Sequence, residues 1–129
     1  MINVIVLDTS VLLFWTLDPD QLSEKARQSI AQVDKIVISS ISIWEIGSKV
    51  KLNKIILPLS FEEYFSRLQQ VERLEILPID TQSWVDNLNL IWEHRDPADR
   101  TIVALAARYN CPLVTSDHTI AEFYSETIW

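Results

Sequence analysis

The sequence predicts a three-layer α/β/α sandwich built on a mostly parallel sheet of four to five strands. Short apolar runs alternate along the chain with segments of helical periodicity. The first run, over residues 3–7, is dominated by β-branched and apolar residues, which is typical of a strand buried on both faces. Because strand and helix alternate throughout, a parallel sheet covered by helices is favoured.

Caps and helix breakers indicate the elements in the first half of the chain. Thr9 or Ser10 can cap a short helix through Leu17, which Asp18 and Pro19 end, because a residue before proline avoids the helical conformation. The other elements expected here are a helix from Ser23, a strand over 36–39, a helix over 41–52 and a helix that Ser60 opens.

The second half continues the alternation. A strand over 74–79 precedes a helix that Asp80 caps, which carries Trp84, Leu88 and Ile91 and ends near His94. Most of the five tryptophans are expected in the core or between packed helices. The remaining elements are a strong helix from Asp96-Pro97 through Tyr109 with Asn110 as its left-handed stop, a strand over 112–115, a short helix with Ile120 and Phe123, and an edge strand over 127–129.

Length and cysteine content limit the class of protein. The chain of 129 residues fits a single domain over residues 1–129. Its one cysteine, Cys111, excludes an internal disulfide and a cysteine-rich zinc site, and it suggests a reducing, cytoplasmic compartment. The first residues lack a positively charged leader and are too few to span a bilayer, so no membrane association is expected.

Charge and glycine content exclude further classes. The formal net charge is −7, which is opposite to the basic balance of proteins that bind nucleic acids mainly through phosphate contacts. A phosphate-bearing substrate would therefore need a metal ion or local basic groups. The single glycine, Gly47, excludes both the glycine-rich phosphate loop and the dinucleotide fingerprint.

Four acidic residues occupy positions where a parallel sheet would bring them together. Asp8 and Asp117 end apolar runs, and Glu45 and Asp99 follow such runs less directly. The carboxyl ends of parallel strands form the ligand-binding edge of an open sheet, so acids from distant positions can converge there. Clustered carboxylates repel one another and call for a divalent cation, for which oxygen ligands favour Mg²⁺ or Mn²⁺.

Three of these acids have a purely structural alternative as parts of helix starts. Asp8 and Asp117 can each cap the helix that follows. Asp99 lies in a favourable helix start in which Asp96 is the cap and Pro97 the first helical residue. Local sequence alone leaves both interpretations open.

Glu45 and the two histidines carry weaker signals. Glu45 can form an exposed pair with Lys49, four residues further on. His94 and His118 could act as a base or as metal ligands, but they lack the spacing of a metal-binding helix and have no cysteine partners. We expect both histidines to be peripheral.

Four stretches, taken together and in order, resemble one family. They are residues 6–13 (VLDTSVLL), 38–46 (ISSISIWEI), 94–100 (HRDPADR) and 113–117 (LVTSD). The set is similar to PIN-domain ribonucleases, and within them to the VapC-like toxins of bacterial toxin-antitoxin pairs. Asn53, where such toxins often carry glycine, and Ala98, where a larger aromatic is common, depart from the pattern beside the acids.

The resemblance implies a sheet of order 3-2-1-4-5, in which the first and fourth strands adjoin and Asp8 lies next to Asp117. It also implies two sets of site residues. The acids that bind metal and catalyse would be Asp8, Glu45, Asp99 and Asp117. The groups that support those acids or position the substrate would be Ser10, Asp96, Arg100 and Thr115.

The function implied is that of a Mg²⁺- or Mn²⁺-dependent endoribonuclease with one or two ions, leaving 5′-phosphate and 3′-hydroxyl ends. The implied partners are RNA, a cognate antitoxin and a second copy of the chain. One alternative is a phosphohydrolase with Asp8 as nucleophile, although the second aspartate such enzymes need two positions later is Ser10 here. Another is a non-catalytic, PIN-like domain that only binds a partner.

Overall fold

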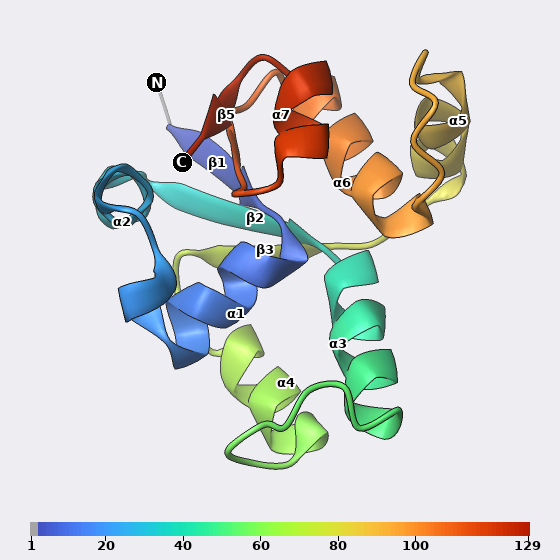
Figure 1. The fold of residues 1–129 in the computed structure, drawn as a ribbon. Helices are drawn as coiled ribbons and strands as arrows, with labels where there is room; N and C mark the ends of the chain where they lie inside the picture. The colour runs from blue at the N-terminus through green and yellow to red at the C-terminus, as the bar shows by residue number, and fades with distance from the viewer. Residues whose placement is uncertain (1–2) are drawn as a thin grey trace.

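The computed structural model describes residues 3–129, whose strands form one sheet in the order β3-β2-β1-β4-β5 (Figure 1). All four neighbouring pairs are parallel. The three-layer fold and the 3-2-1-4-5 order are therefore confirmed. The strands are β1 (Val4–Leu7), β2 (Lys35–Ser39), β3 (Leu74–Leu77), β4 (Leu113–Val114) and β5 (Thr127–Ile128).

Helices cover both faces of the sheet (Figure 1). Helices α1, α2 and α4 contribute to the apolar cluster on one face, and α6 and α7 to the cluster on the other, while α5 packs against α6. The helices are α1 (Thr9–Leu17), α2 (Glu24–Gln32), α3 (Ile41–Lys51), α4 (Phe61–Gln69), α5 (Thr81–Asn89), α6 (Pro97–Arg108) and α7 (His118–Phe123), and a 3₁₀ turn, η1, covers Pro19–Gln21.

Strand β1 is buried on both faces, as its apolar run predicts. Ile5 and Leu7 belong to the cluster formed with α1, α2 and α4, whereas Val6 belongs to the cluster formed with α6. Successive side chains of a strand point to opposite faces, so a strand between two helix layers needs apolar residues at every position. Among residues 3–129, no helix combines the length and apolar character needed to cross a bilayer.

The start of α1 differs from the prediction that Thr9 or Ser10 caps it. Asp8 is the cap, and its Oδ1 accepts a hydrogen bond from the Val11 amide at 2.8 Å. Thr9 is the first residue of the helix and is buried. The capping alternative for Asp8 is therefore confirmed, and the carboxylate keeps a second oxygen for other partners.

The third strand and the fifth helix are both shorter than predicted. Strand β3 ends at Leu77, before Pro78, and α5 ends at Asn89 instead of near His94. The carbonyls of Leu90 and His94 accept hydrogen bonds from the Arg100 guanidinium. The Arg100 side chain thus supplies hydrogen-bond donors that backbone amides would supply if α5 continued. The segment after Asn89 therefore needs no further helical turn to satisfy these carbonyls.

The tryptophans are more exposed than predicted. Trp44, Trp84 and Trp129 are 68%, 42% and 40% exposed. The exposure of Trp84 follows from the orientation of α5. This helix buries Asn87, whose side-chain amide donates to the Thr101 hydroxyl at 2.9 Å. The inner face of α5 is therefore polar, and its apolar stripe faces solvent.

One glycine and two asparagines mark tight backbone positions. A Cβ at Gly47 on α3 would lie 3.1 Å from the ring of Phe61, so glycine allows α4 to approach α3 closely. Asn53 and Asn110 adopt left-handed φ values of 56° and 52°. The left-handed stop predicted at Asn110 is confirmed, and Asn53 adopts a conformation that usually favours glycine.

Two isoleucines provide a matched test of the core. Ile30 on α2 is 1% exposed and Ile56 is 92% exposed. Ile30→Ala is expected to lower the free energy of unfolding by about 2–5 kcal/mol, because it removes buried methylenes and leaves a cavity. Ile56→Ala is expected to change it by less than about 0.5 kcal/mol. Urea denaturation of both variants checks this, and equal losses would contradict the assignment of the core.

Candidate active site

The pairing of β1 with β4 brings two predicted site residues to one edge of the sheet. Leu7 is in register with Val114, and the Asp8 amide donates to the Val114 carbonyl at 3.3 Å. Asp8 and Asp117 therefore leave adjacent strands at the carboxyl edge, at the point where the strand order reverses. The negative charge of Asp117 raises the pKa of Asp8, which reflects this proximity.

Asp8 is the most buried of the four acids, at 6% exposure. The pKa of its carboxyl is raised to about 6, mainly by burial; hydrogen bonds from Thr115 and the Val11 amide lower the pKa, and the charges of Asp99 and Asp117 raise it. A carboxyl at this position is thus costly to ionise without a positive partner.

Glu45 on α3 is held by a chain of hydroxyl groups. The Thr9 hydroxyl donates to Oε1 of Glu45 and lies 2.9 Å from the Ser42 hydroxyl. Because a hydroxyl carries one proton, donation by Thr9 to Glu45 makes Ser42 the donor to Thr9. The alternative of a fully exposed pair with Lys49 is therefore wrong, since α1 and α3 meet at this carboxylate.

Burial is the main reason why the pKa of Glu45 is raised. The negative charges of Asp96 and Asp99 also raise the pKa of this carboxyl, whereas the Thr9 hydrogen bond and the charge of Lys49 lower it. Glu45 on α3 therefore lies close enough to the acids at the start of α6 for their charges to change its pKa, although about fifty positions separate them in the sequence.

Asp99 lies in the first turn of α6, where Asp96 is the cap. Its Oδ2 is 2.7 Å from Nε2 of His94. His94, which was expected to be peripheral, thus contacts one of the four acids. Burial raises the pKa of Asp99, as do the charges of Asp96 and Asp117, while the hydrogen bond to His94 lowers it.

Asp117 is exposed and caps α7, as its structural alternative predicts. Its Oδ1 accepts hydrogen bonds from the amides of Thr119 at 2.8 Å and Ile120 at 3.4 Å. The Asp117 amide donates in turn to the Thr115 hydroxyl at 3.0 Å. Capping and a position in the acidic group coexist, because this carboxylate also raises the pKa of both Asp8 and Asp99.

The four residues predicted to flank the acids differ in what they contact. Thr115 is buried and hydrogen-bonds to the Asp8 side chain. Asp96 is exposed, and its Oδ1 accepts from the Asp99 amide at 3.0 Å. Ser10 is exposed at the start of α1.

Arg100 is used entirely within the protein. Its guanidinium donates to the carbonyls of Asn87, Leu90, Trp92 and His94 and to the Asn87 side chain. All five N–H donors of the group have partners. In this structure the guanidinium holds the segment that carries His94.

Thr9, Ser42 and His94 were not among the predicted site residues. Thr9 follows Asp8 directly, and Ser42 lies three positions before Glu45, so a hydroxyl beside each acid was the available signal. His94 opens the same motif that contains Asp99. What the sequence lacked was the relative placement of α1, α3 and the segment after α5.

The four carboxylates fit a divalent cation by their chemistry. They offer only oxygen donors, and three of them have raised pKa values because of burial and mutual repulsion, which a bound cation would relieve. Their oxygens bond to protein donors here, and among residues 3–129 no three acidic, histidine or cysteine side chains are arranged to share an ion. Binding a cation would require these side chains to turn toward one another.

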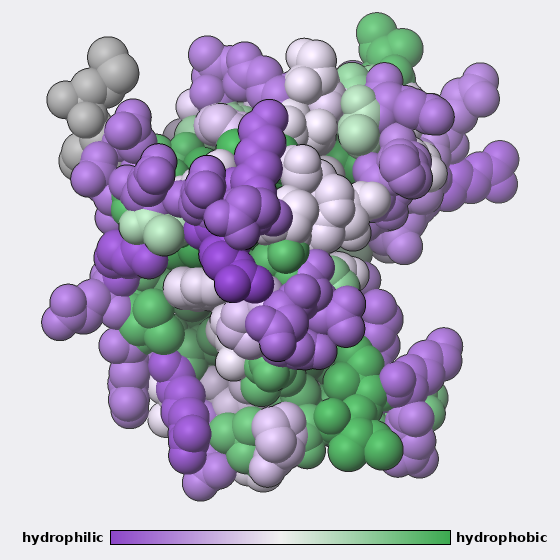
Figure 2. Space-filling model, turned by 60° about the vertical axis from the view of Figure 1, so that its left-hand side comes forward, coloured by the Kyte–Doolittle hydropathy of each residue, from purple (hydrophilic) through white to green (hydrophobic). Residues whose placement is uncertain are grey.

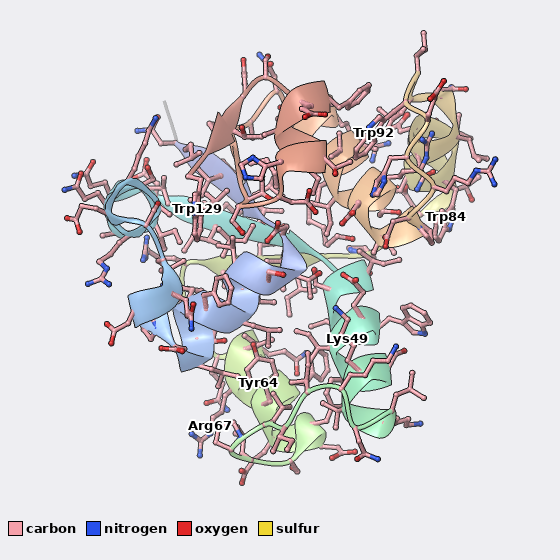
Figure 3. The ribbon with its side chains drawn as sticks, in the orientation of Figure 1. Lys49, Tyr64, Arg67, Trp84, Trp92 and Trp129 are labelled. Carbon is pink, nitrogen blue, oxygen red and sulfur yellow. The ribbon has the colours of Figure 1, made fainter. Side chains whose placement is uncertain are left out.

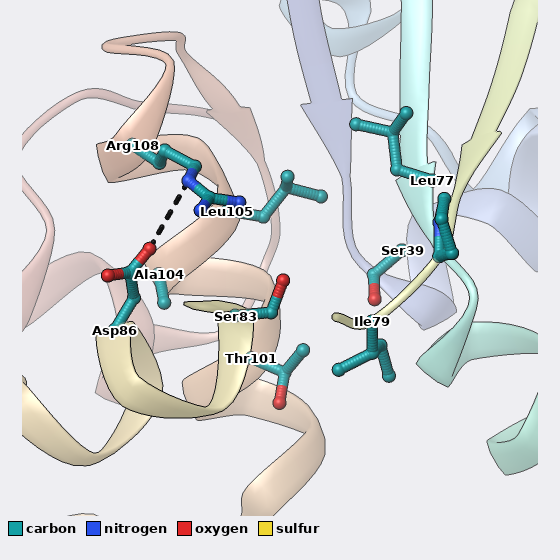
Figure 4. Close-up of a pocket in the computed structure, with 10 residues that line it drawn as sticks. Ser39, Leu77, Ile79, Ser83, Asp86, Thr101, Ala104, Leu105 and Arg108 are labelled. Carbon is teal, nitrogen blue, oxygen red and sulfur yellow. Dashed lines mark ion pairs between the residues drawn. The ribbon is translucent and has the colours of Figure 1, made fainter. Parts of the chain in front are cut away.

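A small hollow elsewhere does not compete as a substrate site (Figure 4). It lies between the end of β3 and helices α5 and α6, where Asp86 and Arg108 form an ion pair at 3.3 Å. Its volume of about 10 Å³ suffices for no more than about one water molecule. The acidic edge of the sheet, where the charges of Asp8, Asp99 and Asp117 act on one another, is the candidate active site.

The fold and the acidic edge define an α/β protein with a candidate metal centre at the switch point of its sheet. The chain belongs to the PIN domain family, whose sequence profile matches residues 5–126.

Known proteins similar to this chain include ribonucleases and toxins. Ribonuclease VapC22 of Mycobacterium tuberculosis is 28% identical over 119 residues, which cover 92% of this chain and 90% of that protein. A toxin-antitoxin complex from Klebsiella pneumoniae matches with a TM-score of 0.65 at 18% identity, covering 96% of this chain and 95% of the other. The M. tuberculosis toxin VapC20, which cleaves the sarcin-ricin loop, matches with a TM-score of 0.66 at 12% identity, covering 92% and 93%.

Asp8 makes the stability of the metal-free protein depend on pH. The folded protein binds the Asp8 proton more tightly than the unfolded chain, because the pKa rises from 3.8 to about 6. Its contribution to stability is therefore fully present below pH 3.8 and is lost as pH rises to about 6.

Asp8→Asn removes this ionisation and keeps a good helix cap. We expect the variant to be more stable than the wild type at pH 7 by about 1–3 kcal/mol, with the difference shrinking toward pH 4. Urea denaturation in a chelator at both pH values measures this. Equal stability at pH 7 would mean that the buried carboxyl ionises without penalty.

Proposed function

We propose that this chain is a metal-dependent endoribonuclease and the toxin of a toxin-antitoxin pair. Membership of the PIN domain family and similarity to ribonuclease VapC22 support the nuclease class. The observation that carries the proposal is the burial of Asp8 among other acids at the carboxyl edge of the sheet. Residues 1–129 would act as one domain, in the cytoplasm.

The proposed metal ligands are Asp8, Glu45, Asp99 and Asp117, with one or two Mg²⁺ or Mn²⁺ ions. When bound, such an ion lowers the pKa of a water molecule and neutralises charge on phosphate oxygens. Hydrolysis of the RNA phosphodiester would leave 5′-phosphate and 3′-hydroxyl ends. The protein's part is to present the four carboxylates at one place with their rotamers limited by neighbours.

Three sets of donors support that arrangement. The Thr9 hydroxyl orients Glu45, the Val11 amide and Thr115 orient Asp8, and the first amides of α7 orient Asp117. These donors hold the backbone and one oxygen of each carboxylate at the edge of the sheet, and the remaining oxygens would have to turn toward one another to share a cation.

An RNA substrate must approach a protein with a net charge of −7. The acidic edge itself would repel phosphate, so a bound cation is needed for binding as well as for chemistry. Lys49 lies near enough to Glu45 to lower its pKa, and Arg95 is exposed beside the start of α6. These two residues are the basic groups best placed to meet the RNA backbone, since Arg100 is fully occupied.

An antitoxin partner is proposed from the similarity to a solved toxin-antitoxin complex. A groove of about 410 Å³ between α1 and α4 is a suitable apolar surface for a segment of such a partner. Figure 2 shows apolar residues gathered in the lower part of the molecule, and Figure 3 labels Tyr64 and Arg67 on α4. The groove is lined by Trp15, Thr16, Leu17, Leu59, Tyr64, Arg67, Leu68 and Val71.

A second copy of the chain is proposed to cover the outer face of α5. Trp84 and Leu88 lie four residues apart on α5, and Ile91 follows just after the helix ends at Asn89; the three side chains are 42%, 77% and 95% exposed. An apolar stripe of this kind on a helix is typical of an interface between protein chains. Figure 3 shows Trp84 at the outer side of α5.

The nuclease proposal predicts cleavage of a mixed RNA pool that requires Mn²⁺ or Mg²⁺ and stops in chelator. Asp8→Asn and Asp99→Asn are expected to reduce the rate by about 10²-fold or more, because each removes a ligand charge. Asp20→Asn, an exposed acid on η1, is the matched control and should cleave at the wild-type rate. Gel electrophoresis and mass spectrometry of the product ends provide the measurement.

Cleavage that survives both substitutions, or that ignores chelator, would reject this mechanism. Metal-dependent release of inorganic phosphate from a phosphomonoester without RNA cleavage would favour the phosphohydrolase alternative. Absence of both activities, with antitoxin binding retained, would favour a non-catalytic binding domain.

The dimer proposal predicts a solution mass of twice one chain by light scattering. Leu88→Glu on α5 is expected to shift the protein to a monomer, because it places a charge in the apolar stripe. Ile56→Glu is the control, since Ile56 is equally apolar and 92% exposed but lies in the connector after α3. A monomeric wild type would contradict the proposal.

A further inference from the structure

We propose that His94 is a positioning residue of the active site, which holds the Asp99 carboxylate in place for a divalent cation. This inference rests on the proposed nuclease function and adds a residue to it. It is carried by one short hydrogen bond and by two independent sets of contacts that fix the imidazole.

The hydrogen bond joins Nε2 of His94 to Oδ2 of Asp99 at 2.7 Å. The two side chains are only 27% and 22% exposed. An ionised carboxylate can only accept hydrogen bonds, so Nε2 is the donor when Asp99 is charged. A hydrogen bond to a charged acceptor in a partly buried position is strong enough to select one rotamer of the carboxylate.

The imidazole ring is held by an aromatic stack. Its centroid lies 4.8 Å from the ring of Trp92, at an interplanar angle of 38°. Trp92 in turn stacks on Phe123 of α7, with centroids 4.7 Å apart and planes 9° from parallel. Figure 3 shows Trp92 between α5 and the α6–α7 side of the molecule. The stack therefore ties His94 to the helix that Asp117 caps.

The backbone that carries His94 is held by Arg100. The guanidinium Nη1 donates to the carbonyls of Trp92 at 2.6 Å and His94 at 3.0 Å. Arg100 directly follows Asp99 on α6. One helix turn thus supplies both the carboxylate and the clamp that places its partner, so the two move together.

Two other acids lie near Asp99. The charges of Asp96 and Asp117 both act against its ionised form. An N–H directed at Oδ2 offsets this repulsion and leaves Oδ1 free. Without this hydrogen bond the Asp99 carboxylate would be free to adopt other rotamers, at a cost to cation affinity.

Mn²⁺ affinity without RNA, measured by calorimetry on the full chain, tests the inference. His94→Phe keeps an aromatic ring against Trp92 and removes the donor, so it should bind Mn²⁺ about 10–100-fold more weakly than the wild type. His94→Gln retains an N–H donor and should bind close to the wild-type value. His118→Ala, which changes the chain's other histidine, is the matched control and should leave the affinity unchanged.

RNA cleavage gives a second readout. His94→Phe should lower kcat and leave KM for RNA unchanged, because His94 acts through Asp99 and not on the substrate. The circular dichroism spectrum and melting temperature of each variant establish that the fold is kept. If His94→Phe fails to fold, His94→Ala replaces it, with the same expected loss and the same comparison with His94→Gln.

The possible failures are distinguishable. Wild-type Mn²⁺ affinity in His94→Phe, or an equal loss in His94→Gln, would overturn the role of His94 and leave the nuclease proposal intact. A wild-type protein that binds no Mn²⁺ and cleaves no RNA would overturn the proposed function and this inference with it.

Discussion

The structure depends above all on the parallel pairing of β1 with β4. This pairing brings the end of a fully buried strand, and with it Asp8, beside the strand that leads to Asp117. Because apolar layers cover both faces of β1, the carboxyl of Asp8 is removed from most of the solvent. Asp8 and the other acids at this edge each accept hydrogen bonds from donors within the protein.

The donors that hydrogen-bond to these acids come from several elements. Asp8 accepts hydrogen bonds from the Val11 amide of α1 and from Thr115 after β4. Glu45 accepts from the Thr9 hydroxyl, which is itself bonded to Ser42 of α3. Asp99 is bonded to the His94 imidazole, which lies after α5. Satisfying polar groups in this way lowers the cost of burying them without removing the net negative charge. The protein therefore keeps an unfavourable local field at the edge where the family relationship suggests chemistry. The clustered carboxylates lower the stability of the protein at the place where function is proposed, which is a common property of active sites.

Sequence patterns were sufficient for the layers and the order of the sheet because these follow from local periodicity and from family motifs. The apolar run at β1, the helix start at Asp96-Pro97 and the stop at Asn110 all lie where local rules put them. The end of α5 could not be predicted, because the Arg100 side chain, several residues later, takes the carbonyls that would have continued the helix. The contact of His94 with Asp99 could not be predicted either, because Trp92 and Arg100 place the imidazole. The convergence of Asp8, Glu45, Asp99 and Asp117 at one edge followed from the motifs, whereas the direction of each side chain required coordinates.

The left-handed turns at Asn53 and Asn110 have a consequence for the unfolded protein. Most chains place glycine at such positions, which adds backbone freedom to the denatured ensemble. This chain has a single glycine in 129 residues and bends with asparagine instead. Asparagine in these turns costs a small strain in the native state. It also lowers the conformational entropy of the unfolded chain, so less entropy is lost when the chain folds and the folded state is favoured.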